Sequence, residues 1–188
     1  VLLESRRRLT KYLSVLHIIR TAHIDWSLHY HRLQAERRNI LQCIQHAQHY
    51  GWLTFWGDLV LGLCELYLMS GPHPSIPKMV SRVIEKEGID FRLKARLAGK
   101  MSIYSRLTSQ YETALDWYNR GLSYLKVKDN AKIECELELN VLRCYTDMGR
   151  YEDAYDAYER SMQIAEFARS RHLVALTLID YGYQQHHK

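Results

Sequence analysis

A recurrence at a spacing of forty residues constrains this chain more than any other feature of its sequence. An aromatic residue, a small residue, a second aromatic and a second small residue occur at Tyr111, Ala114, Tyr118 and Gly121, and again at Tyr151, Ala154, Tyr158 and Ser161. Positions three and four residues apart lie on one face of a helix. A small residue on that face lets a second helix approach closely, and the aromatic side chains one turn away fill the remaining space. The recurrence therefore predicts a repeated unit of two antiparallel helices.

Helical periodicity extends along most of the chain, and no segment alternates apolar and polar residues for long enough to indicate a sheet. Glycines follow several of the apolar segments, as they commonly do at helix ends, and all three prolines fall within residues 72–77. The pattern predicts an all-α fold with helices over about residues 6–28, 35–51, 52–71, 75–88, 91–107, 111–127, 133–148, 152–168 and 172–185.

At the recurring positions the sequence resembles the tetratricopeptide repeat family, whose unit reads W-x2-L-G-x2-Y, then A-x3-F, then P. One unit here reads Glu138-x2-Val141-Leu142-x2-Tyr145, then Gly149, Tyr151, Ala154 and Tyr158, and the unit before it reads Ala98-x2-Met101-Ser102-x2-Ser105, then Tyr111, Ala114 and Tyr118. The spacing is near forty rather than thirty-four, the Trp position never holds Trp, and the closing Pro is absent. Longer, degenerate repeats of this kind look like the C-terminal sensor regions of multidomain bacterial signal-transduction ATPases of the STAND or NB-ARC type.

The resemblance implies an α–α superhelix, a right-handed solenoid of about four helix pairs plus a terminal helix, with residues 1–188 forming a single domain of a larger protein. It also implies a non-catalytic interaction module that binds a partner protein or peptide in a concave groove, lined by the first helix of each pair. The implied groove residues are Asp58, Glu65, Arg96, Lys100, Arg106, Asn140, Arg143, Asp147 and Tyr183, interspersed with Leu61, Leu68, Ile103, Glu136 and Ile179.

The basic residues of that set lead to a more specific expectation about the partner. If the first helices line one groove, Arg96, Lys100, Arg106 and Arg143 gather on one surface, with Glu65, Glu136 and Asp147 around them. Such a surface favours an acidic segment of a partner. The alternative is that all four basic side chains are solvated surface residues, and that alternative stays open here.

Two other functions also stay open. Residues 1–50 contain eight Lys and Arg against three Asp and Glu, a net charge of +5, whereas residues 51–188 are neutral overall. A basic end of this kind can bind an acidic partner or nucleic acid, or it can be a solvated helix face or a surface that joins an upstream domain. The resemblance to signalling ATPases implies instead a ligand-sensing regulatory domain of a multidomain ATPase or transcriptional regulator.

No sequence motif indicates catalysis, and we expect neither enzymatic activity nor a cofactor. The sequence contains no G-x-x-x-x-G-K-[ST], no G-x-S-x-G and no H-E-x-x-H. His46 and His49 are three residues apart, but two possible ligands do not make a metal site, so no metal is expected.

The cysteines and the apolar segments indicate the compartment. Cys43, Cys64, Cys135 and Cys144 form no C-x-x-C pair and lie among apolar helical neighbours, which predicts small buried side chains in a reducing compartment. The longest apolar run, residues 59–69, is short for a membrane span and includes Glu65. We therefore expect a cytoplasmic protein without a membrane segment.

Overall fold

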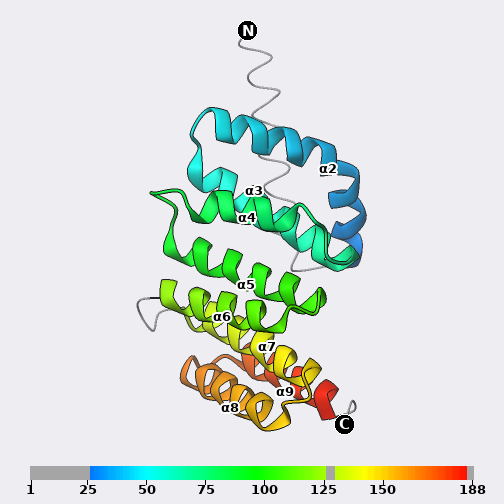
Figure 1. Ribbon diagram of the computed structural model, residues 1–188, viewed down its shortest axis with the longest axis vertical. Helices are drawn as coiled ribbons and strands as arrows, with labels where there is room; N and C mark the ends of the chain where they lie inside the picture. The colour runs from blue at the N-terminus through cyan, green and yellow to red at the C-terminus, as the bar shows by residue number, and fades with distance from the viewer. Residues whose placement is uncertain (1–25, 126–129, 186–188) are drawn as a thin grey trace. The chain divides into compact units, whose positions relative to one another are not determined.

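The computed structural model describes residues 26–125 and 130–185, and the structural statements below concern these residues. This part of the chain consists of helices, with no strand (Figure 1). The eight helices are α2 (Trp26–His49), α3 (Leu53–Ser70), α4 (Ile76–Ile84), α5 (Phe91–Leu107), α6 (Tyr111–Tyr124), α7 (Ala131–Asp147), α8 (Tyr151–Phe167) and α9 (Arg171–Gln185). The all-α prediction is confirmed. The helix expected over residues 6–28 lies outside the described residues except at its end, which belongs to α2.

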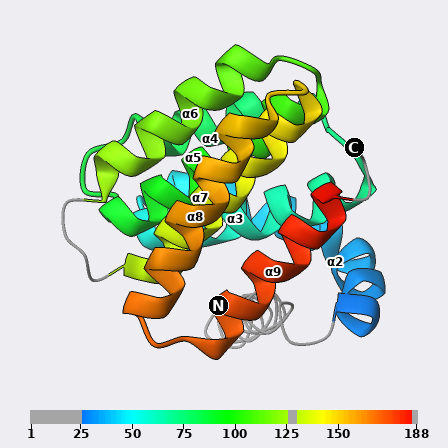
Figure 2. The same ribbon diagram turned by 90° about the horizontal axis from the view of Figure 1, so that it is seen from below.

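The chain divides into two compact units, Val1–Ile89 and Asp90–Lys188. In the first unit α2 packs against α3, and α3 against α4. In the second unit each helix packs against the next from α5 to α9, with the closest pairings in α5–α6 and α7–α8 (Figure 2). In addition, α5 contacts α7, and α7 contacts α9. Sequential pairwise packing is therefore present in both units, whereas the expectation of a single domain over residues 1–188 stays a prediction.

The second unit follows the forty-residue spacing in its helix boundaries. Helices α5, α7 and α9 begin at residues 91, 131 and 171, and α6 and α8 begin at residues 111 and 151. Asp90 marks the first of these starts, because its Oδ1 accepts hydrogen bonds from the backbone N–H groups of Arg92 at 2.9 Å and Leu93 at 3.3 Å. The repeat predicted from side chains is thus also a repeat of the backbone.

One type of turn joins four of the helix pairs. In each, the chain enters the left-handed region one residue before the N-cap of the next helix, at Gly51, Ser109, Gly149 and Arg169, with φ of 69°, 59°, 72° and 50°. After α7 the Gly149 N–H donates to the Thr146 carbonyl and the Arg150 N–H to the Tyr145 carbonyl, both at 2.9 Å. Equivalent bonds occur in the other three turns and satisfy helix-end carbonyls. The next helix then begins two residues beyond the left-handed residue.

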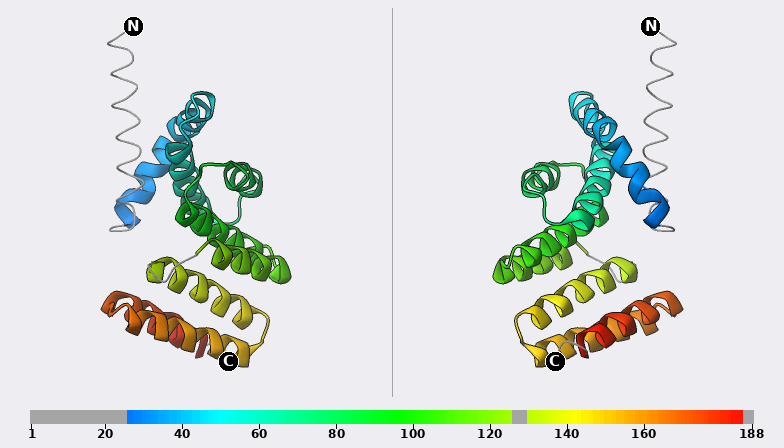
Figure 3. Two further views of the ribbon diagram at one scale, coloured as in Figure 1. Left: turned by 90° about the vertical axis from the view of Figure 1, so that its left-hand side faces the viewer. Right: turned by 90° about the vertical axis from the view of Figure 1, so that its right-hand side faces the viewer.

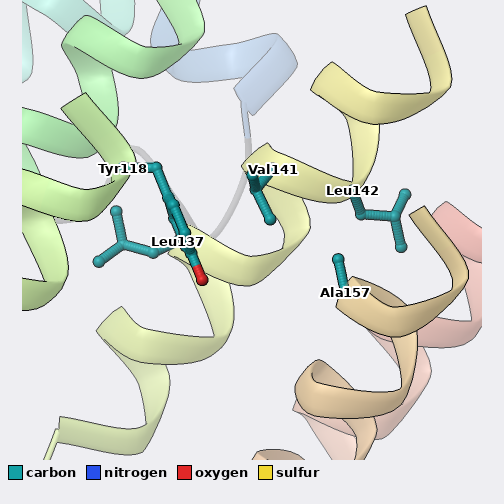
Figure 4. Close-up of a cluster of buried hydrophobic side chains, with 5 residues drawn as sticks. All are labelled: Tyr118, Leu137, Val141, Leu142 and Ala157. Atoms are coloured by element: carbon teal, nitrogen blue, oxygen red, sulfur yellow. The ribbon is translucent and has the colours of Figure 1, made fainter. Parts of the chain in front are cut away.

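The small residues of the recurrence lie where helices approach most closely. Ala114 and Ala154 are fully buried, as predicted. A Cβ added to Gly121 would lie 3.0 Å from Cδ2 of Leu137, so the missing side chain makes room for α7 beside α6. Figure 4 shows the buried cluster that results, drawn from α6, α7 and α8: Tyr118, Leu137, Val141, Leu142 and Ala157.

The first unit is built around α3. More than half of the residues of α3 are buried, and the helix is flanked by α2 and by the short α4, which α3 crosses rather than runs beside (Figure 3). Pro77 lies in the first turn of α4, where a missing N–H leaves no helical bond unmade. Among the described helices, α3 is the one whose length and composition would allow it to cross a membrane. Burial of an apolar helix within a folded core accounts for the same composition.

Candidate functional site

A hollow of about 210 Å³ lies on the second unit, where α5, α7 and α9 line it. We call it the α5–α7–α9 hollow. These are the helices that begin at residues 91, 131 and 171, so the same element of each repeat contributes to the surface. The forty-residue spacing extends to the side chains, because two sets of equivalent positions line the hollow: Arg96, Glu136 and Leu176, and Lys100, Asn140 and Asp180.

Asn140 is the buried polar residue of this hollow. It comes from the middle of α7 and is 8% exposed. Its amide nitrogen faces α5, since a Cβ added to Gly99 would lie 3.6 Å from Nδ2. No hydrogen bond joins the Asn140 side chain to another residue in the described part of the chain. The amide lines the hollow, so its donor and acceptor are available to a ligand that enters it.

The charges of the hollow are mixed, with an excess of positive charge. Arg96, Lys100 and Arg143 line it together with Glu136 and Asp180. Arg143 binds Asp180 through two nitrogens: Nη2 lies 2.6 Å from Oδ1 and 2.8 Å from Oδ2, and Nε lies 3.0 Å from Oδ1. The Asp180 side chain is only 13% exposed. This geometry is the one by which arginine recognises a carboxylate, so the hollow already contains one carboxylate bound by arginine.

The predicted groove residues fall into three groups. Four line the hollow: Arg96, Lys100, Asn140 and Arg143. Two pair with each other instead, since Nη1 of Arg106 lies 2.6 Å from Oδ2 of Asp147, and neither lines the hollow. The other three are not brought to this hollow by the described structure: Asp58 and Glu65 lie in the first unit, and the side chain of Tyr183 lies outside the described residues.

The remaining implied positions divide in the same way. Ile103 and Glu136 line the hollow. Leu61 is buried and Leu68 is half-buried within the first unit. Ile179 is 66% exposed and does not line the hollow, where Leu176 and Asp180 represent α9. Sequence reasoning missed those two residues, although a shift of forty from Glu136 and Asn140 leads directly to them.

A second polar cluster links α6, α7 and α8 away from this hollow. The Tyr118 hydroxyl donates to Oε1 of Glu138 at 2.6 Å, and Nε of Arg160 donates to Oε2 at 3.1 Å. The Glu138 side chain is only 5% exposed. Burial, reinforced by the hydrogen bond to Glu138, raises the pKa of Tyr118 far above its usual range. Both carboxylate oxygens of Glu138 accept a hydrogen bond, so the cluster fixes α6, α7 and α8 relative to one another.

The cysteines are buried, as predicted. Cys43, Cys64, Cys135 and Cys144 form no disulfide and have almost no exposed surface. Burial raises the pKa of Cys144 to about 11, which keeps the thiol protonated and unreactive at neutral pH. In the regions that the structure describes, no group of three or more His, Cys, Asp or Glu side chains is arranged to hold a metal ion.

Comparison of the chain with protein-family models, with curated proteins and with solved structures finds no match. The resemblance to tetratricopeptide repeats therefore rests on the sequence positions and on the helix packing described above, and no family is identified.

Proposed function

We propose that this chain is a non-catalytic binding module of the tetratricopeptide type, a right-handed α-solenoid whose α5–α7–α9 hollow binds an acidic segment of a partner protein. The recurring turn, the pairwise packing and the contacts of α5 with α7 and of α7 with α9 support the solenoid. In a stack of helix pairs, equivalent helices form one continuous surface, and such surfaces bind extended segments.

The Asn140 amide, which lines the hollow without a hydrogen-bond partner in the described part of the chain, carries the proposal. An extended peptide has a free N–H and C=O at every residue, and an asparagine side chain can donate to one and accept from the other. A peptide main chain that enters the hollow would satisfy the Asn140 amide without requiring a particular peptide sequence. Selectivity would come from the charged side chains around it.

The surrounding charges favour acidic residues in the bound segment. Three basic side chains against two acidic ones leave the lining positive, and Asp180 already neutralises Arg143 in part. A partner carboxylate in the hollow would also lie near Lys100 and Arg96. A carboxylate that displaces Asp180 would regain the bidentate geometry on Arg143.

The test begins with a partner protein captured by the 188-residue chain, from which a fluorescent peptide spanning the bound segment is prepared. Fluorescence anisotropy then compares this peptide with versions in which its acidic residues are neutral. We expect Asn140→Ala to weaken binding about tenfold, the factor that corresponds to about 1.4 kcal/mol of lost hydrogen bonding. Lys100→Ala should weaken binding less, and mainly by slowing association.

Lys132→Ala is the matched control, because Lys132 is an exposed residue of α7 that does not line the hollow. If this control weakens binding as much as Lys100→Ala, the attraction is a property of the overall charge and the hollow is not the site. If Asn140→Ala has no effect while neutral peptides bind equally well, the proposal is wrong. Salt-dependent capture of DNA or RNA in place of a protein would favour the nucleic-acid alternative.

A further inference from the structure

A separate pocket of about 320 Å³ lies within the first unit, far in sequence from the α5–α7–α9 hollow. Helix α2 contributes Gln34 and Arg37, the end of α3 contributes Leu66, Tyr67 and Ser70, and residues 71–73 close it. Gly71 adopts a φ of 115°, a conformation that side chains rarely allow, and this turn directs the following residues back toward α3. Three of its side chains, Arg37, Tyr67 and His73, can donate hydrogen bonds.

Three side chains fix the geometry of the pocket. The rings of Tyr67 and His73 are stacked, with centroids 4.0 Å apart and planes inclined by 9°. The guanidinium carbon of Arg37 lies 4.9 Å from the centroid of the Tyr67 ring, and Nε of Arg37 donates to the Tyr67 hydroxyl oxygen at 3.3 Å. Stacking holds the His73 ring in place, so the direction of its nitrogens is set by the packing.

His73 presents a donor toward another donor. The backbone N–H of Ser75 donates to Nδ1 of His73 at 3.2 Å, so Nδ1 carries no proton and the neutral ring is protonated at Nε2. Nε2 lies 3.5 Å from Nη2 of Arg37. Arginine has no acceptor, so these two N–H groups cannot bond to each other. An acceptor oxygen placed between them would satisfy both.

Tyr67 supplies a third donor. Its oxygen accepts from Arg37, but its own O–H proton has no acceptor among the residues that the structure describes. Tyr67 is only 6% exposed, so solvent gives little compensation. Three donors from α2, α3 and the segment after it therefore converge in this pocket.

We propose that this pocket binds the oxyanion group, a carboxylate or a phosphate, of a small organic anion. Arg37 and His73 bind the anionic oxygens, and the Tyr67 hydroxyl donates to a third position. The volume is at the lower end of the range for small-molecule sites, and Leu66 and Pro72 provide apolar wall for the rest of the ligand. This site lies in a different unit from the surface of the proposed function, and neither inference depends on the other.

Nuclear magnetic resonance of the 188-residue chain tests the proposal, with sodium phosphate and sodium acetate as probes at constant ionic strength. The His73 ring nitrogens and the Tyr67 ring are observed during each titration. We expect saturable shifts at both rings, and the tighter of the two probes identifies the anion class. Before any addition, the nitrogen shifts of His73 should report a proton on Nε2.

Three variants, each checked for an unchanged near-ultraviolet circular dichroism spectrum, separate a site from diffuse attraction. Arg37→Met should weaken probe binding about tenfold, the factor expected for loss of a charge-assisted hydrogen bond, and Tyr67→Phe should weaken it by less. Arg38→Met removes the same charge from the neighbouring, exposed position of α2 and should leave binding unchanged. Absence of saturable shifts, equal losses in Arg37→Met and Arg38→Met, or a proton on Nδ1 of His73 would each overturn the proposal.

Discussion

The two helix pairs α5–α6 and α7–α8 share one frame, yet equivalent side chains in them have different surroundings. Tyr118 and Tyr158 occupy the same position of the repeat. Tyr118 is buried and donates to Glu138, whereas Tyr158 is half-buried and its ring stacks on Tyr181 at 4.1 Å. The difference comes from the helix that follows: α7 supplies the carboxylate of Glu138, and α9 has Leu178 at the equivalent position. The position in the forty-residue repeat thus determines where a side chain points, and the following helix determines which residues it contacts.

The same relation holds at the second small position of the frame. Gly121 leaves room for Leu137, and forty residues later Ser161 faces Thr177, the equivalent of Leu137. The two hydroxyl oxygens of Ser161 and Thr177 are 2.8 Å apart, and Sγ of Cys135 lies 3.2 Å from Oγ of Ser161. One pair of helices is therefore joined by an apolar contact and the other by a polar one. Gly121 therefore suits the bulky apolar Leu137, and Ser161 suits the hydroxyl of Thr177.

The largest effect is expected at the position that both helix pairs share. Ala114 and Ala154 are each fully buried between helices, so Leu at either position overpacks the contact. We expect Ala114→Leu and Ala154→Leu each to lower the free energy of unfolding by up to about 3 kcal/mol. Gln163→Ala, at an exposed position of α8, should change it by less than about 0.5 kcal/mol. Urea unfolding would measure the free energy of unfolding of all three variants. If Ala154→Leu destabilises the chain and Ala114→Leu does not, the two helix pairs are not equivalent.

The next largest effect is expected when the Gly121–Leu137 contact is copied to the equivalent positions, Ser161 and Thr177. Thr177→Leu places a larger side chain against Ser161 and removes its hydroxyl partner, which we expect to destabilise the chain by about 2 kcal/mol. Adding Ser161→Gly recreates the Gly121–Leu137 contact and should recover about 1 kcal/mol despite the glycine in a helix. Thermal unfolding of the two single variants and the double variant checks this, and strictly additive losses would show that the two contacts are not equivalent.

The two tyrosines give a smaller and asymmetric effect. Tyr118→Phe removes a hydrogen bond to a buried carboxylate and should cost about 1.5 kcal/mol. Tyr158→Phe keeps the ring that stacks on Tyr181 and should cost less than about 0.5 kcal/mol. Equal losses in chemical denaturation would contradict the different roles of the two hydroxyl groups.

The smallest effect is expected at the turns. Ser109 and Gly149 adopt the same left-handed conformation at equivalent positions, with φ of 59° and 72°. Gly149→Ser should destabilise the chain by about 1 kcal/mol, and Ser109→Gly should stabilise it by about 0.5 kcal/mol. We expect the midpoint of urea unfolding to fall in Gly149→Ser and to rise in Ser109→Gly. Shifts of the same sign would mean that the two turns are not equivalent.

Much of this fold is predictable from the sequence because helical periodicity and the forty-residue spacing agree. Helix α5 has the bounds that its apolar pattern predicts, and α7, α8 and α9 begin within two residues of the predicted starts. The turns are less visible. Gly51 and Gly149 mark two of them, but Ser109 and Arg169 adopt left-handed conformations without a glycine to signal it. Helix α4 ends at Ile84, earlier than Gly88 indicated, because the Glu85 N–H and the Lys86 N–H close the helix there.

The sites are predictable only where they follow the repeat. Arg96, Lys100, Asn140 and Arg143 line the hollow because equivalent helices form one surface. The binding of Arg143 to Asp180 depends on side-chain directions across two helices, and sequence spacing contains no such information. The pocket around Arg37 and His73 joins residues 36 apart through a glycine turn outside any repeat, so no periodic signal leads to it.

The central claim is that equivalent residues of the repeat take their roles from the helix that follows. A pair of double-mutant cycles tests it most directly: Tyr118→Phe with Glu138→Leu, and Tyr158→Phe with Leu178→Ala at the equivalent positions. The account predicts a coupling free energy of about 1–2 kcal/mol in the first cycle and about zero in the second. No coupling in the first cycle, or equal coupling in both, would contradict it.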